Sequence, residues 1–207
     1  MTMEQQGIFI TGTDTDVGKT YVGSRWVQHL WESGHKITAR KPAESGCTQD
    51  AQGQRAGQDA LAYYHACQGK IPLTTINAFR YLASLAPPAA ADLEGQQLTI
   101  AGLADACRCE PTEYLIVEGA GGWRSPLAHD GSNADLAELL GLKVMLVATD
   151  RLGCLNHILL TLESVEKRGL EVALVVLNRM HPDQSSASNL SWLQEHLSSP
   201  VVVYEKA

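Results

Sequence analysis

Residues 12–20 read Gly-Thr-Asp-Thr-Asp-Val-Gly-Lys-Thr, and this stretch decides the fold of the chain. It follows an apolar run, Ile8–Ile10, and precedes a segment with helical periodicity that starts near Lys19. A loop that joins a strand to a helix and ends in Gly-Lys-Thr cradles phosphate groups, because backbone N–H groups and the positive end of the helix dipole face the anion. In such a loop the lysine reaches the outer phosphates, and the hydroxyl of the last residue, here Thr20, ligates Mg²⁺. The stretch therefore predicts a nucleotide, a magnesium ion and an α/β fold.

The loop departs from the strict phosphate-loop (P-loop) pattern at one position. That pattern has glycine five residues before Gly18, where this chain has Thr13, and Gly12 lies one residue too early. We therefore interpret the stretch as a variant P-loop. The residues of this loop that we expect to contact the nucleotide are Gly12, Thr13, Asp14, Thr15, Asp16, Val17, Gly18, Lys19 and Thr20.

The composition favours one soluble domain without a nucleic-acid partner. The length of 207 residues predicts a single domain over residues 1–207. The net charge of −7 argues against a nucleic-acid partner, which needs a clustered basic face. We find no basic leader and no run of roughly 18 apolar residues, so we expect a cytoplasmic protein without a membrane partner. The five cysteines lack the spacing of a metal site or a disulfide framework, and we expect free thiols.

Short apolar runs alternate with segments of helical periodicity along the chain. The runs are continuous and rich in β-branched residues, as in strands buried on both faces of a sheet. This alternation predicts a doubly wound, mainly parallel α/β sheet flanked by helices, of the P-loop NTPase type. The expected strands are Ile8–Thr11, Ile37–Arg40, Tyr114–Val117, Val144–Ala148, Val172–Leu177 and Val201–Tyr204. The expected helices are Lys19–Glu32, Asp59–Cys67, Ile100–Cys107, Asp135–Leu140, Asn156–Lys167 and Ser188–Leu197.

Two looser segments, Ala43–Gly57 and Ala83–Gln97, interrupt this alternation. Ligands of open parallel sheets bind beyond the carboxyl ends of the strands. The first segment follows the strand that delivers Lys41, so we expect it to flank the ligand site, with an ordinary surface loop as the alternative.

Three charged residues near the expected strand ends are candidates for the chemistry. Glu118 ends an apolar strand, where P-loop proteins place a carboxylate that binds Mg²⁺ directly or through water; the alternative is a solvated glutamate in a turn. Asp59 is either a second such carboxylate or the N-cap of the helix that follows it. Lys41 is either a cation that neutralises charge on a transferred phosphoryl group or a surface lysine. The glycines at 119, 121 and 122 let the backbone approach a ligand closely.

Four stretches, in this order, resemble motifs of the dethiobiotin synthetase family. Thr11–Thr20 is similar to the P-loop of that family, and Lys41–Gly46 to its substrate-lysine loop. Glu118–Trp123, followed by Pro126-Leu127, is similar to its metal-and-substrate segment. Leu152–His157 is similar to its dimer-interface segment. The resemblance covers nearly the whole chain.

The resemblance implies an ATP- and Mg²⁺-dependent ligase whose substrates are 7,8-diaminononanoate and CO₂ or bicarbonate. CO₂ adds to one amine to give a carbamate, which ATP phosphorylates to a carbamic–phosphoric anhydride. The second amine expels phosphate and closes the cyclic urea of dethiobiotin. The resemblance also implies a homodimer with its active sites at the subunit interface.

The resemblance assigns roles to individual residues. The implied Mg²⁺ ligands are Thr20, Asp59 and Glu118. The implied catalytic residues are Lys19, Lys41, Thr15 and Ser45. Beyond the P-loop, the implied nucleotide contacts are Glu118, Gly119, Ala120, Gly121, Gly122 and the base-reading Asn178. The implied substrate contacts are Lys41, Ser45, Gly121 and Gly122, together with Gly153, Cys154 and Asn156 of the partner-subunit segment that receives the substrate carboxylate.

The chain departs from the family pattern in three places. Asp16 stands where the family often has Glu, so any contact of that side chain loses one methylene of reach. The alignment of Asp59 rests on the Ala60-Leu61 that follows it. Family members usually continue beyond the strand after Pro200 with a Pro-containing loop that helps enclose the base. Here we expect a more open base site and a weaker preference for adenine.

The main alternative is a switch ATPase of the partitioning or regulatory type. Those proteins carry a lysine just after the Thr13 position, where this chain has Asp14. They also bind membrane or DNA through basic or amphipathic segments, which we do not find. An amide-forming ligase related to cobyrinate amidation would need a glutamine-hydrolysing domain, for which 207 residues leave no room.

Overall fold

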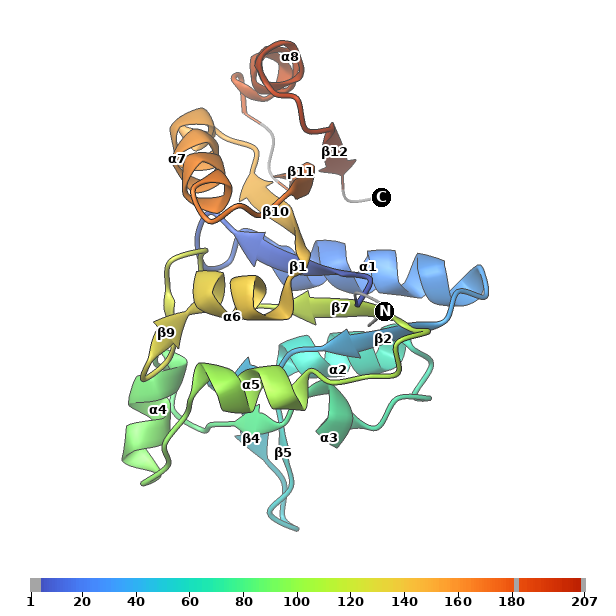
Figure 1. The fold of residues 1–207 in the computed structure, drawn as a ribbon, viewed down its shortest axis with the longest axis vertical. Coiled ribbons are helices and arrows are strands. Elements are labelled where there is room, and N and C mark those ends of the chain that lie inside the picture. Colours follow the sequence, from blue (N-terminus) through green and yellow to red (C-terminus); the bar gives the residue numbers. More distant parts are fainter. Residues whose placement is uncertain (1–4, 181–182, 206–207) are drawn as a thin grey trace.

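A six-stranded parallel sheet forms the centre of the computed structural model, which describes residues 5–180 and 183–205 (Figure 1). The strand order is β12-β11-β10-β1-β7-β2, and every neighbouring pair is parallel. The strands are β1 (Gly7–Gly12), β2 (Ile37–Arg40), β7 (Tyr114–Glu118), β10 (Lys143–Thr149), β11 (Val172–Arg179) and β12 (Val201–Glu205). All six strands expected from the sequence are confirmed.

Helices cover both faces of this sheet, which confirms the doubly wound α/β fold (Figure 1). The core of one face includes α1 (Lys19–Glu32), α2 (Gln58–Ala66) and α3 (Leu73–Ile76). The core of the other includes α4 (Pro87–Leu93), α5 (Ile100–Ala106), α6 (Asn133–Leu140), α7 (Cys154–Glu166) and α8 (Ser186–His196). Successive side chains of a strand point to opposite faces, so Phe9 joins one core while Ile8 and Ile10 join the other.

The position of β1 in the sheet explains where the ligand site forms. β1 pairs with β10 on one side and with β7 on the other. Because all of these strands are parallel, the segments that follow β1, β7 and β10 leave the sheet at the same edge. The P-loop follows β1 directly and therefore lies at the middle of this edge.

The looser segments contain more local structure than the sequence predicts. α4 lies within 83–97 and begins at the Pro87-Pro88 pair, which suits a first helical turn because proline needs no N–H partner there. Within 43–57, Ala43–Glu44 (β3) pairs with Phe79–Arg80 (β6), and Thr48–Gln49 (β4) pairs with Arg55–Ala56 (β5). Outside the looser segments, Pro126–Ala128 (β8) pairs with Gly131–Ser132 (β9). Each is two or three residues long, too short for a periodic signal.

Within the two described ranges, no helix combines the length and the apolar character that a bilayer crossing demands.

A close approach between α1 and α2 depends on Gly23. A Cβ atom at this position would lie 2.1 Å from the Tyr63 hydroxyl and 2.9 Å from Cδ1 of Ile10. We expect Gly23→Val to lower the free energy of unfolding by about 1–3 kcal/mol through overpacking, measured by urea denaturation. Gln28→Val, on the exposed face of the same helix, is the matched control for helix propensity. Equal losses in the two variants would contradict this account of the packing.

Candidate active site

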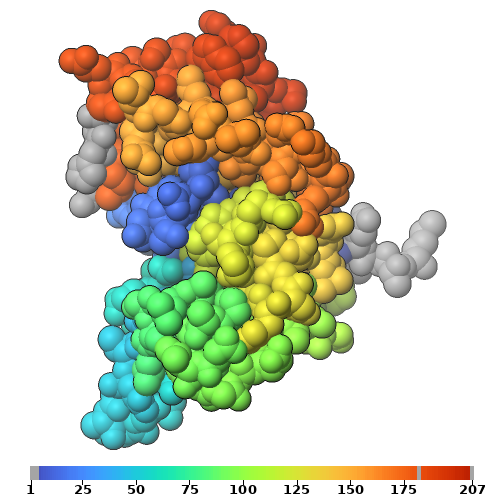
Figure 2. All heavy atoms as spheres, turned by 90° about the vertical axis from the view of Figure 1, so that its left-hand side faces the viewer, coloured from blue at the N-terminus to red at the C-terminus, as the bar shows by residue number. Residues whose placement is uncertain are grey.

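The P-loop borders a cavity of about 800 Å³ at the carboxyl edge of the sheet. This edge faces the viewer in Figure 2, where the blue P-loop segment lies between the orange and the cyan-green parts of the surface. Gly18 has φ 92° and precedes the first turn of α1, a left-handed conformation that suits glycine. Asp16 also adopts a positive φ of 58°, and aspartate tolerates this region better than most side chains.

The cavity gathers most of the predicted catalytic and metal-binding residues. Those that line it are Thr15, Asp16, Gly18, Lys19, Thr20, Lys41, Ser45, Asp59, Ala120 and Gly121. Other predicted residues, which are outside this lining, are Gly12, Thr13, Asp14, Val17, Glu118, Gly119, Gly122, Asn178, Gly153, Cys154 and Asn156. Unpredicted residues share the lining, among them Glu44, Ser84, Leu85 and Ser125.

Lys41 is a buried cation held by two carboxylates. It is only 2% exposed, so the surface-lysine alternative is wrong. Its Nζ lies 2.6 Å from Oε1 of Glu118 and 2.8 Å from Oδ2 of Asp59, and it also donates to the carbonyl of Gly119 at 2.9 Å. Burial alone would lower the pKa of Lys41, but the charges of Glu118 and then Asp59 outweigh it and raise this pKa. The side chain therefore stays charged at neutral pH.

Glu118 is the most heavily bonded carboxylate of the site. Its exposed fraction is 0%, so the alternative of a solvated glutamate is wrong. Oε1 accepts hydrogen bonds from the Thr20 hydroxyl at 2.8 Å and from Lys41, while Oε2 accepts one from the Tyr63 hydroxyl at 2.7 Å. β7 thus delivers Glu118 to the first turn of α1.

Asp59 faces Lys41 and does not cap its own helix. The N-cap of α2 is Gly57, so the N-cap alternative is wrong. The carboxylate of Glu44 serves the helix end instead, accepting hydrogen bonds from the backbone N–H groups of Asp59 at 2.8 Å and Ala60 at 3.0 Å. Burial would raise the pKa of Asp59, but the charge and hydrogen bond of Lys41, together with Thr20 and Lys19, lower it. Asp59 is therefore ionised at neutral pH.

Lys19 lies beside this cluster and is also buried. Its Nζ donates to the carbonyl of Asp14 at 3.1 Å, so the side chain curls back over the P-loop. Burial, followed by the positive charge of Lys41, lowers the pKa of Lys19. An anion placed near both ammonium groups would relieve this repulsion, which suits a phosphate site.

Asn133 holds the glycine segment that follows Glu118. Its fully buried amide accepts from the N–H of Ala120 at 3.0 Å and donates to the carbonyls of Ala120 at 2.7 Å and Gly122 at 2.9 Å. The Ser125 hydroxyl accepts from the N–H of Gly122 at 2.9 Å. These bonds fix the backbone of a segment whose glycines give it little conformational preference of its own.

Asn178, near the end of β11, supports the P-loop through a hydrogen bond to its backbone. Its Nδ2 donates to the carbonyl of Val17 at 2.9 Å, and a Cβ atom on Gly18 would lie 1.9 Å from the same nitrogen. Within residues 5–180 and 183–205, the buried Oδ1 atom of Asn178 has no hydrogen-bond partner. The contact explains why glycine is needed at position 18 for space as well as for conformation.

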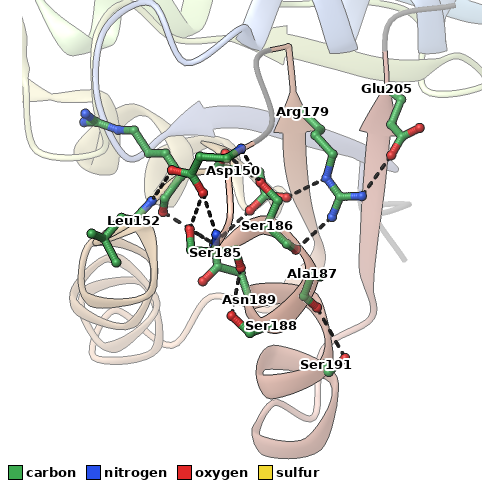
Figure 3. A network of polar contacts seen from close by, with 12 residues as sticks. Asp150, Leu152, Arg179, Ser185, Ser186, Ala187, Ser188, Asn189, Ser191 and Glu205 are labelled. Atoms are coloured by element: carbon green, nitrogen blue, oxygen red, sulfur yellow. Dashed lines mark hydrogen bonds and ion pairs between the residues drawn. The ribbon is translucent and has the colours of Figure 1, made fainter.

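The start of α7 is held by a separate polar network (Figure 3). The buried Asp150 carboxylate accepts from Nε of Arg179 at 2.8 Å and from Nδ2 of Asn189 at 2.9 Å. Arg179 also bonds to Glu205 at 2.8 Å, and Asp183 accepts from the N–H of Leu152 at 3.0 Å. The network ties the segment before Gly153 and Cys154 to the ends of β11 and β12. The network therefore stabilises the N-terminal end of α7, which carries Gly153, Cys154 and Asn156.

Sequence reasoning missed Glu44, Tyr63 and Asn133, which position the predicted residues. Glu44 lies inside the Lys41–Gly46 motif, so its place in the motif was an available signal. Tyr63 and Asn133 carry no such signal, because their roles depend on contacts with segments 55 and 13 residues away.

A parallel doubly wound sheet, a Gly-Lys-Thr loop at its central strand and carboxylates from β7 and α2 define a P-loop nucleotide-binding protein. In agreement, residues 6–203 match the family model described as an AAA domain. An ATP-dependent dethiobiotin synthetase from Pseudomonas paraeruginosa is 41% identical over 196 residues, covering 93% of this chain and 86% of the relative. One from Rhodopirellula baltica is 36% identical, covering 94% and 81%. The chain therefore belongs to the dethiobiotin synthetases, ATP-dependent ligases of biotin biosynthesis.

More distant solved structures share the fold alone. A nucleotide-binding protein in complex with ADP from Archaeoglobus fulgidus has a TM-score of 0.53 at 11% identity, covering 98% of this chain and 82% of that one. The signal recognition particle receptor FtsY from Elizabethkingia anophelis has a TM-score of 0.50 at 13% identity, covering 99% and 61%.

We expect Asn133→Ala to destabilise the protein by about 2–4 kcal/mol, because it leaves several buried backbone groups without partners. Chemical denaturation measures this loss. Gln97→Ala, which removes an exposed side-chain amide, should change stability by less than about 0.5 kcal/mol. If both variants unfold like the wild type, the glycine segment does not depend on Asn133.

Proposed function

We propose that this chain converts 7,8-diaminononanoate, CO₂ and ATP into dethiobiotin, ADP and phosphate, as a single-domain, cytoplasmic homodimer. The observation that supports the proposal best is the Lys41 ammonium, which lies between two carboxylates on the wall of the P-loop cavity. A buried cation beside a phosphate site suits a reaction in which an anionic carbamate attacks a phosphoryl group, because both reactants are negative.

Magnesium is part of this proposal, and the donors of the site suit it. Thr20, Asp59 and Glu118 would hold the ion through hydroxyl and carboxylate oxygens, the hard ligands that Mg²⁺ prefers. When bound there, the ion neutralises charge on the phosphate oxygens.

The residues of the cavity divide the remaining work. The P-loop backbone and Lys19 hold the phosphates, and Thr15 of the same loop lines the cavity beside them. Lys41 stabilises the carbamate oxygen and the charge that develops on the transferred phosphoryl group. Ser45 and the Gly121–Gly122 backbone orient the diamine.

The proposed reaction has three steps. One amine nitrogen attacks CO₂ and releases a proton. A carbamate oxygen then attacks the terminal phosphorus of ATP, and ADP leaves. Finally the second amine attacks the carbonyl carbon and releases a proton, and phosphate leaves with that oxygen as the ring closes.

The dimer is supported by the segment that begins α7. A 13-residue helix offers its N-terminus at Gly153 and Cys154 to a carboxylate, which here would be that of a substrate bound in the partner subunit. Leu152, just before α7, is 81% exposed, and Leu160, within α7, is 58% exposed. Exposed apolar side chains suit a subunit interface if they form one patch.

Asn178 is proposed to read the nucleotide base. Its Nδ2 already donates one hydrogen bond to the carbonyl of Val17, while Oδ1 has no partner among the described residues and can accept a hydrogen bond from a base. An acceptor suits a base that carries an amino group, as adenine does.

Phosphate release from MgATP and bicarbonate tests the proposed reaction, with and without 7,8-diaminononanoate. We expect release only with the diamine, together with dethiobiotin identified by mass spectrometry. Release that ignores the diamine would contradict the proposal and favour a switch ATPase.

We expect Lys19→Ala to reduce kcat/KM for ATP by roughly 100-fold or more, because a charged phosphate contact is lost. The melting temperature should change little, since burial already disfavours this charge. Lys36→Ala, which removes an exposed lysine, is the control. Wild-type kinetics in the Lys19 variant would remove this residue from the mechanism.

A further inference from the structure

Tyr63 is buried at the metal-binding end of the site but has no part in the mechanism above. Its exposed fraction is 0%, and it reaches from the second turn of α2 to Glu118. The hydroxyl donates to Oε2 of Glu118 at 2.7 Å and fits into the space left by Gly23. A hydroxyl buried in this way costs free energy unless it finds a partner. Here the partner is a charged carboxylate, which makes the bond a strong one.

The two oxygens of Glu118 have different partners. Oε1 is shared by the Thr20 hydroxyl and Lys41. Oε2 accepts a hydrogen bond from the Tyr63 hydroxyl, and no other donor to Oε2 is present among the residues that the structure describes. Rotation of the carboxylate would break these bonds, and the carboxylate is therefore held in one orientation.

We propose that Tyr63 is a positioning residue, which occupies Oε2 of Glu118 and thereby turns Oε1 toward Thr20 as the oxygen that binds the metal ion. This inference rests on the proposed function, in which Thr20 and Glu118 bind Mg²⁺. Outer partners of this kind orient the ligands of a metal, and their loss typically weakens metal affinity or activity by 10–100-fold. Gly23 is needed for the same positioning, because a larger residue there would displace the Tyr63 hydroxyl.

Tyr63→Phe tests the proposal, because it removes one oxygen and keeps the ring. Tyr64→Phe is the matched control: it removes the hydroxyl of the next residue, which is half-buried and lies against Gly69. Mn²⁺ is the probe, and its affinity for the protein with ADP is measured by electron paramagnetic resonance, well below the unfolding transition of each variant.

We expect Tyr63→Phe to weaken Mn²⁺ binding roughly tenfold and to raise the KM for Mg²⁺ by a similar factor. kcat at saturating Mg²⁺ should stay within about twofold of the wild type, as should the affinity for ADP measured with a chelator, because neither depends on how readily the ion enters the site. Tyr64→Phe should match the wild type in every measurement.

Unchanged Mn²⁺ affinity and unchanged KM for Mg²⁺ in Tyr63→Phe would overturn the proposal. An equal loss in metal-free ADP affinity would also overturn it, because that result indicates a general structural role. Dethiobiotin formation by the wild type is recorded in the same series. If the wild type forms none, the proposed function fails, while the Mn²⁺ measurement still reports on Tyr63.

Discussion

The ion pairs of Lys41 with Asp59 and Glu118 are the constraint on which the rest of the site depends. A buried ammonium group is tolerated only when opposite charges and hydrogen bonds replace its water, and here both carboxylates lie within 2.8 Å of Nζ. Each partner comes from a different element, since Lys41 follows β2, Asp59 lies on α2 and Glu118 ends β7. The pairs therefore bring a helix and two strand ends together at one point.

Polar groups farther out maintain this arrangement. Glu44 accepts hydrogen bonds from N–H groups in the first turn of α2 and so fixes the position of Asp59 relative to Lys41. Asn133 holds the glycine segment whose first carbonyl, that of Gly119, also accepts from Lys41. Tyr63 orients Glu118 from the opposite side. The flexible parts of the site are thus fixed by buried side chains rather than by their own backbone preferences.

The fold was largely predictable because its signals are local. β-branched runs predict buried strands, and Gly18-Lys19-Thr20 predicts the start of α1, which begins at Lys19 as expected. α4 was missed because its Pro87-Pro88 start is typical of a loop as well as of a first helical turn. Asp59 and Lys41 could be named as candidates from the sequence, but their roles could not be chosen from the two alternatives for each. Only the folded chain shows that the two side chains form an ion pair. Tyr63 and Asn133 act on distant segments, which no local pattern reveals.

We propose that Lys41 acts on the reacting groups rather than on nucleotide binding. The most direct measurement compares Lys41→Met with the wild type, using calorimetry for MgATP affinity and rapid quench for dethiobiotin formed in a single turnover. We predict a single-turnover rate lower by about 100-fold or more, a loss larger than any loss of MgATP affinity. A loss of ATP affinity that accounts for the whole loss of rate would contradict the claim.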